Sequence, residues 1–431
     1  MKHLTTRALR LHASRPAGKI EIVPSKPCAD GNDLSLAYTP GVAAPCLAIR
    51  DDPDASWQYT GRGNLVGVIT NGTAVLGLGN IGALAGKPVM EGKALLFKRF
   101  AGIDAVDLEL ATTDPTAFCN AVSLLEPSFG GINLEDIKAP ECFEIEEHLR
   151  TVMGIPIFHD DQHGTAVVVA AALLNALHLT GRKPEEARVT ISGAGAAGIA
   201  VARHLLRIGI RRRHLTLCDI HGIVYKGRRE GMHRWLAPLA SSRPAGTLAD
   251  ALDGADVFIG VSAPRIMTSA MLRKMRPDPI VFALANPVPE IEYEAARATR
   301  PDAVIATGRS DLPNQVNNLL GFPFLFRGAL DVRASTIDDA MKLAASETLA
   351  ALARRPVPAS VLKAYGVKRL AFGRDYLLPR PFDPRLLEIV SSAVAAAAME
   401  SGVARAPIAD FDAYRRRLRS LARQLTARFA A

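Results

Sequence analysis

The stretch RVTISGAGAAGIAVARHLLRIG, residues 188–209, decides the fold. It begins as a short apolar strand, turns through GAGAAG (193–198) and continues as a helix that Gly209 ends. The next apolar run, HLTLCD, ends in Asp219, 26 residues after Gly193. A glycine turn between a strand and a helix, followed at about this distance by an acid, is typical of a dinucleotide-binding unit.

The glycines of this turn allow the backbone to approach a pyrophosphate, and the helix start offers N–H groups to it. Asp219 is the predicted acceptor for ribose hydroxyls, which favours NAD⁺, whereas Lys226, Arg228 and Arg229 are placed to bind the phosphate of NADP⁺. The choice between the two coenzymes therefore stays open, and a turn without a ligand is the structural alternative. The predicted coenzyme-binding residues of the turn are Gly193, Ala194, Gly195, Ala196, Ala197 and Gly198.

Strands and helices alternate on both sides of this stretch. Short apolar runs follow at 256–261, 279–286 and 302–308, while NLVGVIT (64–70) and GIDAVDLEL (102–110) are the clearest strands before it. Such alternation predicts an α/β fold with a doubly wound parallel sheet covered on both faces. We predict three parts: an N-terminal α/β catalytic domain over 1–160, a Rossmann-type NAD(P)-binding domain over 161–384 and a helical C-terminal segment over 385–431.

The amino-acid composition indicates which class of protein this chain forms. The chain has 431 residues, 48% of them hydrophobic and 22% charged, which is ordinary for a globular protein. Its unbroken apolar runs are shorter than a bilayer crossing needs, and five cysteines without a CxxC pair favour reduced thiols in a cytoplasm. The net charge of +9 has no aromatic interleaving that would bind nucleic acid, so we expect it to attract small anions.

A second glycine motif, GLGNIG (77–82), lacks the context of the first. Gly86 and Pro88 follow it closely and predict that any helix after it is cut short. The N–H groups of such a turn suit a smaller anion, such as a substrate carboxylate. A tight turn without a ligand is the alternative.

Two pairs of acids stand where ligands are expected. Asp160 and Asp161 enter the apolar helix of IPIFHDDQHGTAVVVAAALLNAL (155–177), and Glu135 and Asp136 leave a strand in GGINLEDIKAP (130–140). Glu135, Asp136 and one of the other two would supply three hard oxygen donors, which suits Mg²⁺ or Mn²⁺. Each pair alone is also typical of a helix cap or a solvated turn, and we interpret His163 as a capping or packing residue.

Two further residues suit proton transfer. Lys93 precedes the apolar run Ala94–Phe97, and apolar surroundings are expected to lower its pKa toward that of a base. Tyr38 precedes a Pro–Gly turn that would present its hydroxyl. A solvated lysine and a core tyrosine are the structural alternatives.

Taken together, these motifs resemble the short bacterial type of the malic enzyme family, from about Gly18 to about Asp339. The resemblance implies oxidative decarboxylation of L-malate to pyruvate and CO₂, with NAD or NADP as hydride acceptor, Mg²⁺ or Mn²⁺ as metal and a homodimer or larger homo-oligomer. The runs that carry it are LSLAYTPGVAAPC, VLGLGNIGALAGKPVMEGKALLFKRFAGID, GGINLEDIKAPECFEIE, IPIFHDDQHGTA, GAGAAGIA, ANPVPEI and LPNQVNNLLGFPFLFRGALD.

The resemblance also implies roles for matching residues. It makes Tyr38 the general acid and Lys93 the general base and a substrate contact, while Asp160 supports the metal ligands. The implied metal ligands are Glu135, Asp136 and Asp161. Asn286 and Asn318 are implied to contact substrate or coenzyme, and the implied substrate loop is Val75, Leu76, Gly77, Leu78, Gly79, Asn80, Ile81 and Gly82.

Two departures from the family pattern are visible. Ala74 stands two residues before LGLG, where animal and plant members carry an arginine for the malate carboxylate. The phosphotransacetylase-like extension of longer bacterial members is also not expected here. Three other readings remain: a non-decarboxylating 2-hydroxyacid or amino-acid dehydrogenase, a regulatory binding protein that lost turnover, and a basic nucleic-acid module.

Overall fold

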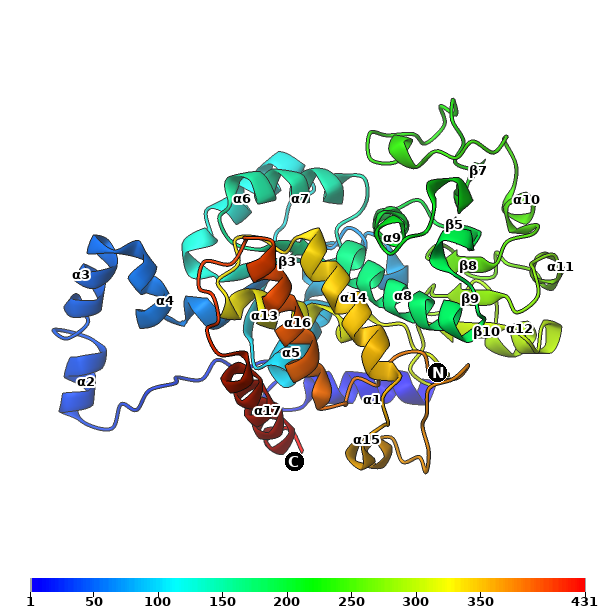
Figure 1. The fold of residues 1–431 in the computed structure, drawn as a ribbon. Coiled ribbons are helices and arrows are strands. Elements are labelled where there is room, and N and C mark those ends of the chain that lie inside the picture. The colour runs from blue at the N-terminus through cyan, green and yellow to red at the C-terminus, as the bar shows by residue number, and fades with distance from the viewer. Residues whose placement is uncertain (1, 431) are drawn as a thin grey trace.

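The computed structural model describes residues 2–430, and Figure 1 shows two sheet-centred units lying side by side. The first sheet has the strand order β2-β1-β3-β4, and all of its strands are parallel. Helices cover it, so β1 and β3 are almost completely buried. Its elements are β1 (Leu65–Thr70), α5 (Ala83–Ala101), β2 (Asp104–Glu109), α6 (Pro115–Ser123), β3 (Gly131–Leu134), α7 (Glu141–Val152) and β4 (Ile157–His159).

The second sheet confirms the predicted Rossmann-type architecture. Its order is β10-β9-β8-β5-β6-β7, parallel except for β7. The chain order reverses at β5, and ligands bind at such a reversal, beyond the carboxyl ends of the strands. The strands are β5 (Val189–Ser192), β6 (Leu215–Asp219), β7 (Gly222–Ile223), β8 (Val257–Gly260), β9 (Ile280–Ala283) and β10 (Val304–Thr307); the helices are α9 (Ala196–Arg207), α10 (Leu248–Leu252), α11 (Ser269–Arg273) and α12 (Tyr293–Thr299).

Helix α8 (Asp160–Leu179) connects the two sheets. Every residue from Ala166 to Leu173 is buried, and the helix packs against α9 and against α14 (Asp339–Ala353). Among the described residues it is the one helix long and apolar enough to cross a membrane, but 72% of its apolar window is buried within the protein. It is therefore the central core helix of a two-unit protein.

Helix α5 corrects the expectation that Gly86 and Pro88 would end a helix. It continues to Ala101, and Gly102 ends it in the left-handed conformation. A proline inside a helix removes one N–H donor, whereas α5 gains the burial of Met90, Phe97 and other apolar side chains against the first sheet. Tertiary packing therefore outweighs the local signal.

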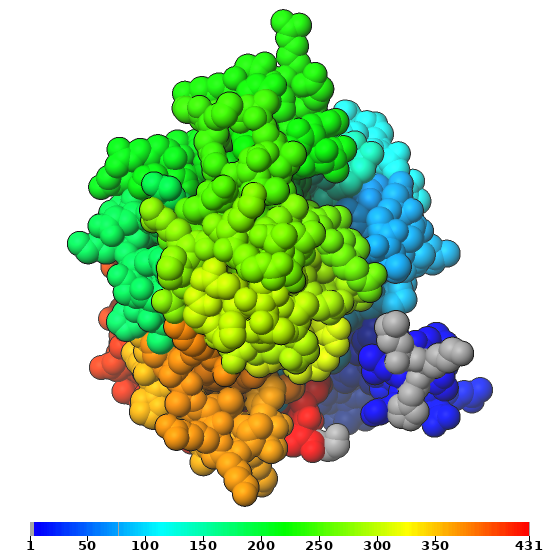
Figure 2. Space-filling view, turned by 90° about the vertical axis from the view of Figure 1, so that its right-hand side faces the viewer, coloured from blue at the N-terminus to red at the C-terminus, as the bar shows by residue number. Residues whose placement is uncertain are grey.

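The C-terminal helices return to the core, which confirms the predicted helical C-terminal region. Phe97 of α5 packs against Phe322 and Phe326 of α13, with ring centroids 4.8 and 5.2 Å apart. The predicted domain limits at 160/161 and 384/385 stay a prediction. The helices are α13 (Phe322–Asp331), α14 (Asp339–Ala353), α15 (Ala359–Ala364), α16 (Arg385–Glu400) and α17 (Phe411–Arg428). Figure 2 shows the second unit in green and yellow above this orange and red region.

The N-terminal arm, residues 20–51, projects from the body of the molecule (Figure 1). Its helices α2 and α3 contain no buried residue. Leu36 and Tyr38 are each 68% exposed. The arm therefore presents apolar surface that the rest of its own chain does not cover. The N-terminal helices are α1 (Lys2–Ala13), α2 (Gly31–Ala37), α3 (Ala43–Asp51) and α4 (Ser56–Tyr59).

Candidate functional site

The two pairs of acids meet at one edge of the first sheet. Glu135 and Asp136 follow β3, and Asp160 and Asp161 open α8 directly after β4. Because β3 and β4 are parallel neighbours, their carboxyl ends lie together. Carboxylate oxygens of Glu135, Asp136 and Asp161 lie within 4.8 Å of one another. The structure thus brings the three predicted metal ligands together, and we call these three residues the carboxylate cluster.

Backbone geometry aims the cluster inward. Asp136 has φ of 55°, a left-handed conformation that turns the chain sharply after Glu135. The Asp136 N–H donates to Asp161 Oδ2 at 2.8 Å, and the Ala74 N–H donates to the Asp136 carbonyl at 2.9 Å. The side chain of Asp161 keeps about a third of its surface exposed, so the cluster has one open side.

Lys93 is buried and lies beside the carboxylate cluster. Its Nζ is 2.8 Å from Glu135 Oε1 and 2.5 Å from Asp160 Oδ2, and it lies 4.2 Å from the centre of the Phe322 ring. Asn318 Nδ2 also donates to Asp160 Oδ2, at 2.5 Å. Asp160 therefore binds Lys93 and Asn318 rather than joining the cluster.

Gly164 makes room for Asp160. A Cβ at position 164 would lie 1.8 Å from Asp160 Oδ1 and 3.2 Å from Asn318 Cβ. Only glycine leaves this space free. Gly164, the glycine of HDDQHG, therefore leaves room for the Asp160 side chain in the first turn of α8.

Burial and mutual repulsion raise the pKa values of the acids. Burial raises the pKa of Glu135 and of Asp160 to about 7, and the charge of Lys93 opposes this rise. Burial also raises the pKa of Asp161 to about 6, with the Asp160 charge adding to the effect. One lysine does not balance these carboxylates, so the site retains a demand for positive charge.

The expectation of a lowered Lys93 pKa is wrong for the chain without metal. Burial does lower it, but the charges and hydrogen bonds of Asp160 and Glu135 together raise the pKa above its ordinary value. The apolar flank seen in the sequence is real, since Ala94 and Phe97 are buried. The sequence did not show that two carboxylates far from Lys93 along the chain, Glu135 after β3 and Asp160 after β4, would hold the proton.

Three residues at the site were missed by sequence reasoning. Asn133 Nδ2 donates to Glu135 Oε2 at 2.9 Å, and Phe322 covers the Lys93 ammonium. His159 is fully buried, and burial lowers its pKa to about 4, so a neutral imidazole lies beside Asp161. The amide of Asn133 inside a buried strand was a readable signal; nothing in the sequence marked Phe322.

His163 lies away from the cluster. Its Nε2 contacts the two carboxylate oxygens of Glu146 at 2.8 and 3.0 Å. This confirms the interpretation of His163 as a packing residue.

The loop of the second glycine motif lies where the two units meet. A Cβ at Gly77 would be 2.3 Å from the Asn286 carbonyl oxygen, so this loop touches the segment after β9. Gly79 and Gly82 have φ of 74° and 81°, which favours glycine. Leu78 and Ile81 are exposed at its rim, Val75 is buried, and the side chain of Leu76 lies outside the described part of the structure. Asn286 thus lies beside this loop, whereas Asn318 lies at the other predicted site, where its Nδ2 donates to Asp160.

The first glycine motif has the form of a pyrophosphate cradle. Gly193 has φ of 112°, and a Cβ there would lie 2.5 Å from the Val261 carbonyl oxygen. A Cβ at Gly198 would lie 1.7 Å from the Gly193 carbonyl oxygen, which holds the helix against the turn. Gly195, by contrast, faces open space and is followed by the start of α9. The turn therefore leaves its helix N-terminus accessible to an anion.

Asp219 at the end of β6 is already paired. Arg228 Nη1 and Nη2 donate to its two carboxylate oxygens at 2.7 and 2.5 Å, and the His221 N–H donates to Oδ1 at 2.8 Å. The Arg228 side chain is 1% exposed. The acid is therefore neutralised by a buried cation where a coenzyme ribose is expected.

Tyr38, the predicted general acid, does not lie beside Lys93 of the same chain. It lies on the N-terminal arm, whereas Lys93 lies in α5 in the body of the molecule (Figure 1). Its side chain is exposed to solvent. Within one chain, the described surroundings of Lys93 lack this hydroxyl.

Comparison with known proteins agrees with this geometry. Residues 17–117 match the family model "Malic enzyme, N-terminal domain", and residues 162–362 match "Malic enzyme, NAD binding domain". The crystal structure of malic enzyme from Pyrococcus horikoshii OT3 superposes with a TM-score of 0.90 at 41% identity, covering 99% of this chain and 98% of that one.

Curated relatives agree in sequence. The NADP-dependent malic enzyme of Rhizobium meliloti is 58% identical over 95% of this chain, and this chain spans 54% of that protein, about half its length. The NADP-dependent malic enzyme of Halomonas elongata is 55% identical over 93% of this chain and 94% of its own length. This chain belongs to the malic enzyme family.

Proposed function

We propose that this protein catalyses the oxidative decarboxylation of L-malate to pyruvate and CO₂ with reduction of NAD⁺ or NADP⁺. The contact of Lys93 with Asp160 and Glu135, beside the carboxylate cluster, carries the proposal. This cluster lies at the strand ends of the first unit, and the glycine turn at 193–198 belongs to the second unit. Family membership supports the same reaction.

Glu135, Asp136 and Asp161 would hold Mg²⁺ or Mn²⁺, because three carboxylates gathered within 4.8 Å of one another suit a hard divalent cation. When bound, such a cation polarises the ketone and stabilises the enolate that forms on loss of CO₂, while the coenzyme accepts the hydride. Asp160 holds Lys93 in place, and Asn318 holds Asp160. The buried Phe322 ring excludes water from one side of the ammonium.

Lys93 takes the proton from the C2 hydroxyl of malate in this proposal. It can do so only when its interaction with Asp160 and Glu135 weakens, because the charges of these carboxylates keep Lys93 protonated. A cation held by Glu135 would offset one of these charges and so would lower the pKa of Lys93. The amides of residues 75–82, with Asn286 beside them, would bind the malate carboxylates in place of the arginine that Ala74 replaces.

We propose a homodimer in which the N-terminal arm of each subunit supplies Tyr38 to the site of its partner. The exposed apolar residues of the arm support a covered position in an assembly. C3 of the enolate requires a proton. Within one chain Tyr38 does not lie beside Lys93 and so cannot donate it, whereas an arm that reaches a second copy brings the Tyr38 hydroxyl to the site of that copy. The five cysteines are free, which supports our proposal of a cytoplasmic enzyme.

We further propose a preference for NADP⁺. Arg228 occupies both oxygens of Asp219, so this acid has less capacity to accept from ribose hydroxyls and no longer repels a 2′-phosphate. Lys226 and Arg229 are exposed nearby and add positive charge. The pairing of Asp219 thus removes the feature that favoured NAD⁺.

Lys93→Ala should lower turnover by a factor on the order of 10², the scale of a lost acid–base group. Lys98→Ala is the matched control from the same helix, because Lys98 pairs with Asp104 outside the site. Coenzyme reduction and pyruvate release are measured with malate and Mn²⁺. Near-normal turnover of Lys93→Ala, or oxaloacetate as the final product, would contradict the proposal.

Mn²⁺ should raise the melting temperature more near pH 7.5 than near pH 5.5. Glu135, Asp160 and Asp161 have raised pKa values, so between about pH 4 and about pH 7 the folded chain binds more protons than the unfolded chain. These groups therefore make the metal-free chain less stable as pH rises through this window, and a metal that replaces the protons reverses the loss.

Thermal melts in EDTA and in excess Mn²⁺ at the two pH values measure this effect. Asp161→Asn should lose most of the Mn²⁺ response, whereas Asp412→Asn, on the exposed start of α17, should keep it. An Mn²⁺ shift that is the same at both pH values would speak against the carboxylate cluster as the metal site.

Subunit complementation tests the shared site. Lys93→Ala and Tyr38→Phe should each be inactive alone, but a heterodimer of the two has one site with both native residues. Random pairing of equal amounts on co-expression should therefore restore about a quarter of native activity. If Tyr38 served its own chain, each site of the heterodimer would carry one defect, and no activity would return.

Arg228→Gln should shift the coenzyme preference toward NAD⁺. The freed Asp219 carboxylate would repel the 2′-phosphate and accept from ribose hydroxyls, so kcat/KM for NADP⁺ should fall about tenfold or more relative to that for NAD⁺. Both values are measured at saturating malate, with circular dichroism as a check on folding. An unchanged ratio of the two would disprove the role of this pair.

A further inference from the structure

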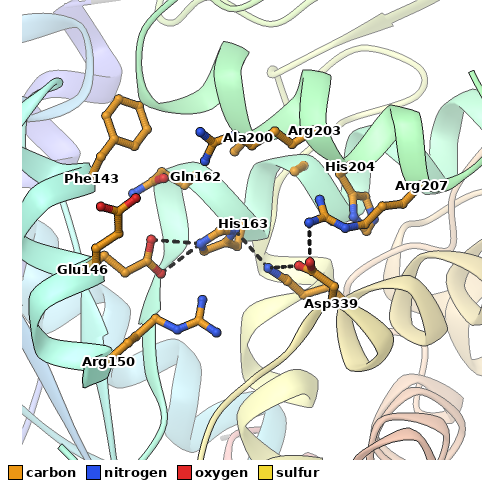
Figure 3. A pocket seen from close by; sticks show the side chains of 13 residues that line it. Phe143, Glu146, Arg150, Gln162, His163, Ala200, Arg203, His204, Arg207 and Asp339 are labelled. Atoms are coloured by element: carbon orange, nitrogen blue, oxygen red, sulfur yellow. Dashed lines mark hydrogen bonds and ion pairs between the residues drawn. The ribbon is translucent and has the colours of Figure 1, made fainter. Parts of the chain in front are cut away.

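A second cavity lies on the opposite side of α8 from the carboxylate cluster. It encloses about 190 Å³ between α7, α8, α9 and α14 (Figure 3). At about 100° per residue, Gln162, His163 and Ala166 face this cavity, whereas Asp160, Asp161 and Gly164 point the other way. The cavity is therefore separate from the proposed malate site.

The acids of this cavity already have partners. Glu146 accepts from His163, and Asp339 pairs with Arg207 and, at 2.7 Å, with Lys342 (Figure 3). Glu147 accepts from Trp235 Nε1 at 2.6 Å and pairs with Arg234 at 3.0 Å. No carboxylate of the lining is left to bind a further cation.

The donors of the cavity are not used up. Among the residues that the structure describes, neither Arg150 nor Arg203 has a carboxylate partner; each donates to one neutral oxygen, of Thr336 and Trp235, at 3.2 Å. Gln162 is only 3% exposed, lines the cavity, and its Nε2 has no hydrogen-bond partner. A buried donor without an acceptor is costly, which indicates that an acceptor belongs there.

The charge of the lining points to the same kind of ligand. Arg150, Arg203, Arg207 and Lys342 face Glu146, Glu147 and Asp339, so the cavity has an excess of positive charge. A guanidinium presents parallel N–H groups that match the oxygens of a carboxylate or a phosphate. Burial lowers the pKa of the Arg203 guanidinium, and the charges of Glu147, Glu146 and Asp339 only partly oppose this effect.

We propose that this cavity binds a small oxyanion of charge about −2, either a dicarboxylate or a phosphate, between Arg150 and Arg203 with Gln162 as a further donor. Arg150 lies on α7 beside the first sheet and Arg203 on α9 beside the second, so the ligand links the two units. Gln162 directly follows Asp160 and Asp161, which places the ligand one residue from the proposed metal site. This binding site goes beyond the proposed reaction, because malate and coenzyme do not occupy it.

Thermal unfolding of the full chain in EDTA tests the site, with inorganic phosphate or succinate titrated against sodium chloride of equal ionic strength. At least one of the two anions should raise the melting temperature beyond chloride. The apparent Kd should weaken about tenfold or more in Arg203→Gln and in Arg150→Gln, because each loses a charge-assisted pair. Arg423→Gln, an exposed change on α17, should leave the Kd unchanged.

The two anions distinguish the ligand chemistry. A response to phosphate alone assigns the site to phosphates, a response to succinate alone assigns it to dicarboxylates, and a response to both assigns it to dianions in general. The absence of any response beyond chloride would overturn the proposal. So would an equal response of the native chain and both arginine variants, since it would place the anion outside this cavity, for example at the glycine turn of residues 193–198.

Discussion

The ion pairs of Lys93 with Asp160 and Glu135 are the interaction on which the rest of the site depends. Burying carboxylates without a partner is costly, and four of them gather where β3 and β4 end. A single lysine satisfies two of these side chains, and Asn133 and Asn318 satisfy further oxygens. One lysine charge does not balance Glu135, Asp160 and Asp161, which explains why the site suits a divalent cation rather than another side chain.

Helix α8 fixes the position of these acids relative to both units. Its apolar body is buried among α9 and α14, so its first turn is held in place and the acids cannot withdraw to solvent. The same turn presents Asp160 and Asp161 on one side and Gln162 and His163 on the other. The carboxylate cluster and the second cavity are therefore built on opposite faces of the same helix.

Local sequence patterns predicted the position of a feature where residues of distinctive chemistry lie at a defined point of the backbone, such as a strand end. The glycine turn, the strand ends and the paired acids all lie at carboxyl ends of parallel strands, where ligand sites are expected. They failed where distant segments compete with local preference. Pro88 does not break α5, because the helix gains burial against the first sheet. Burial does lower the pKa of Lys93, but the charges and hydrogen bonds of Asp160 and Glu135 outweigh this effect.

The sequence by itself determined the alternation of strands and helices, the two glycine turns and the types of side chain available for proton transfer and metal binding. These features follow from short-range periodicity and from a few residue types with restricted chemistry. Only the tertiary structure decided the partners of each group: Arg228 on Asp219, Glu146 on His163, and an exposed Tyr38 apart from Lys93. Such pairings depend on packing between segments far apart in the chain, and charge and burial act over distances in space that residue spacing does not encode.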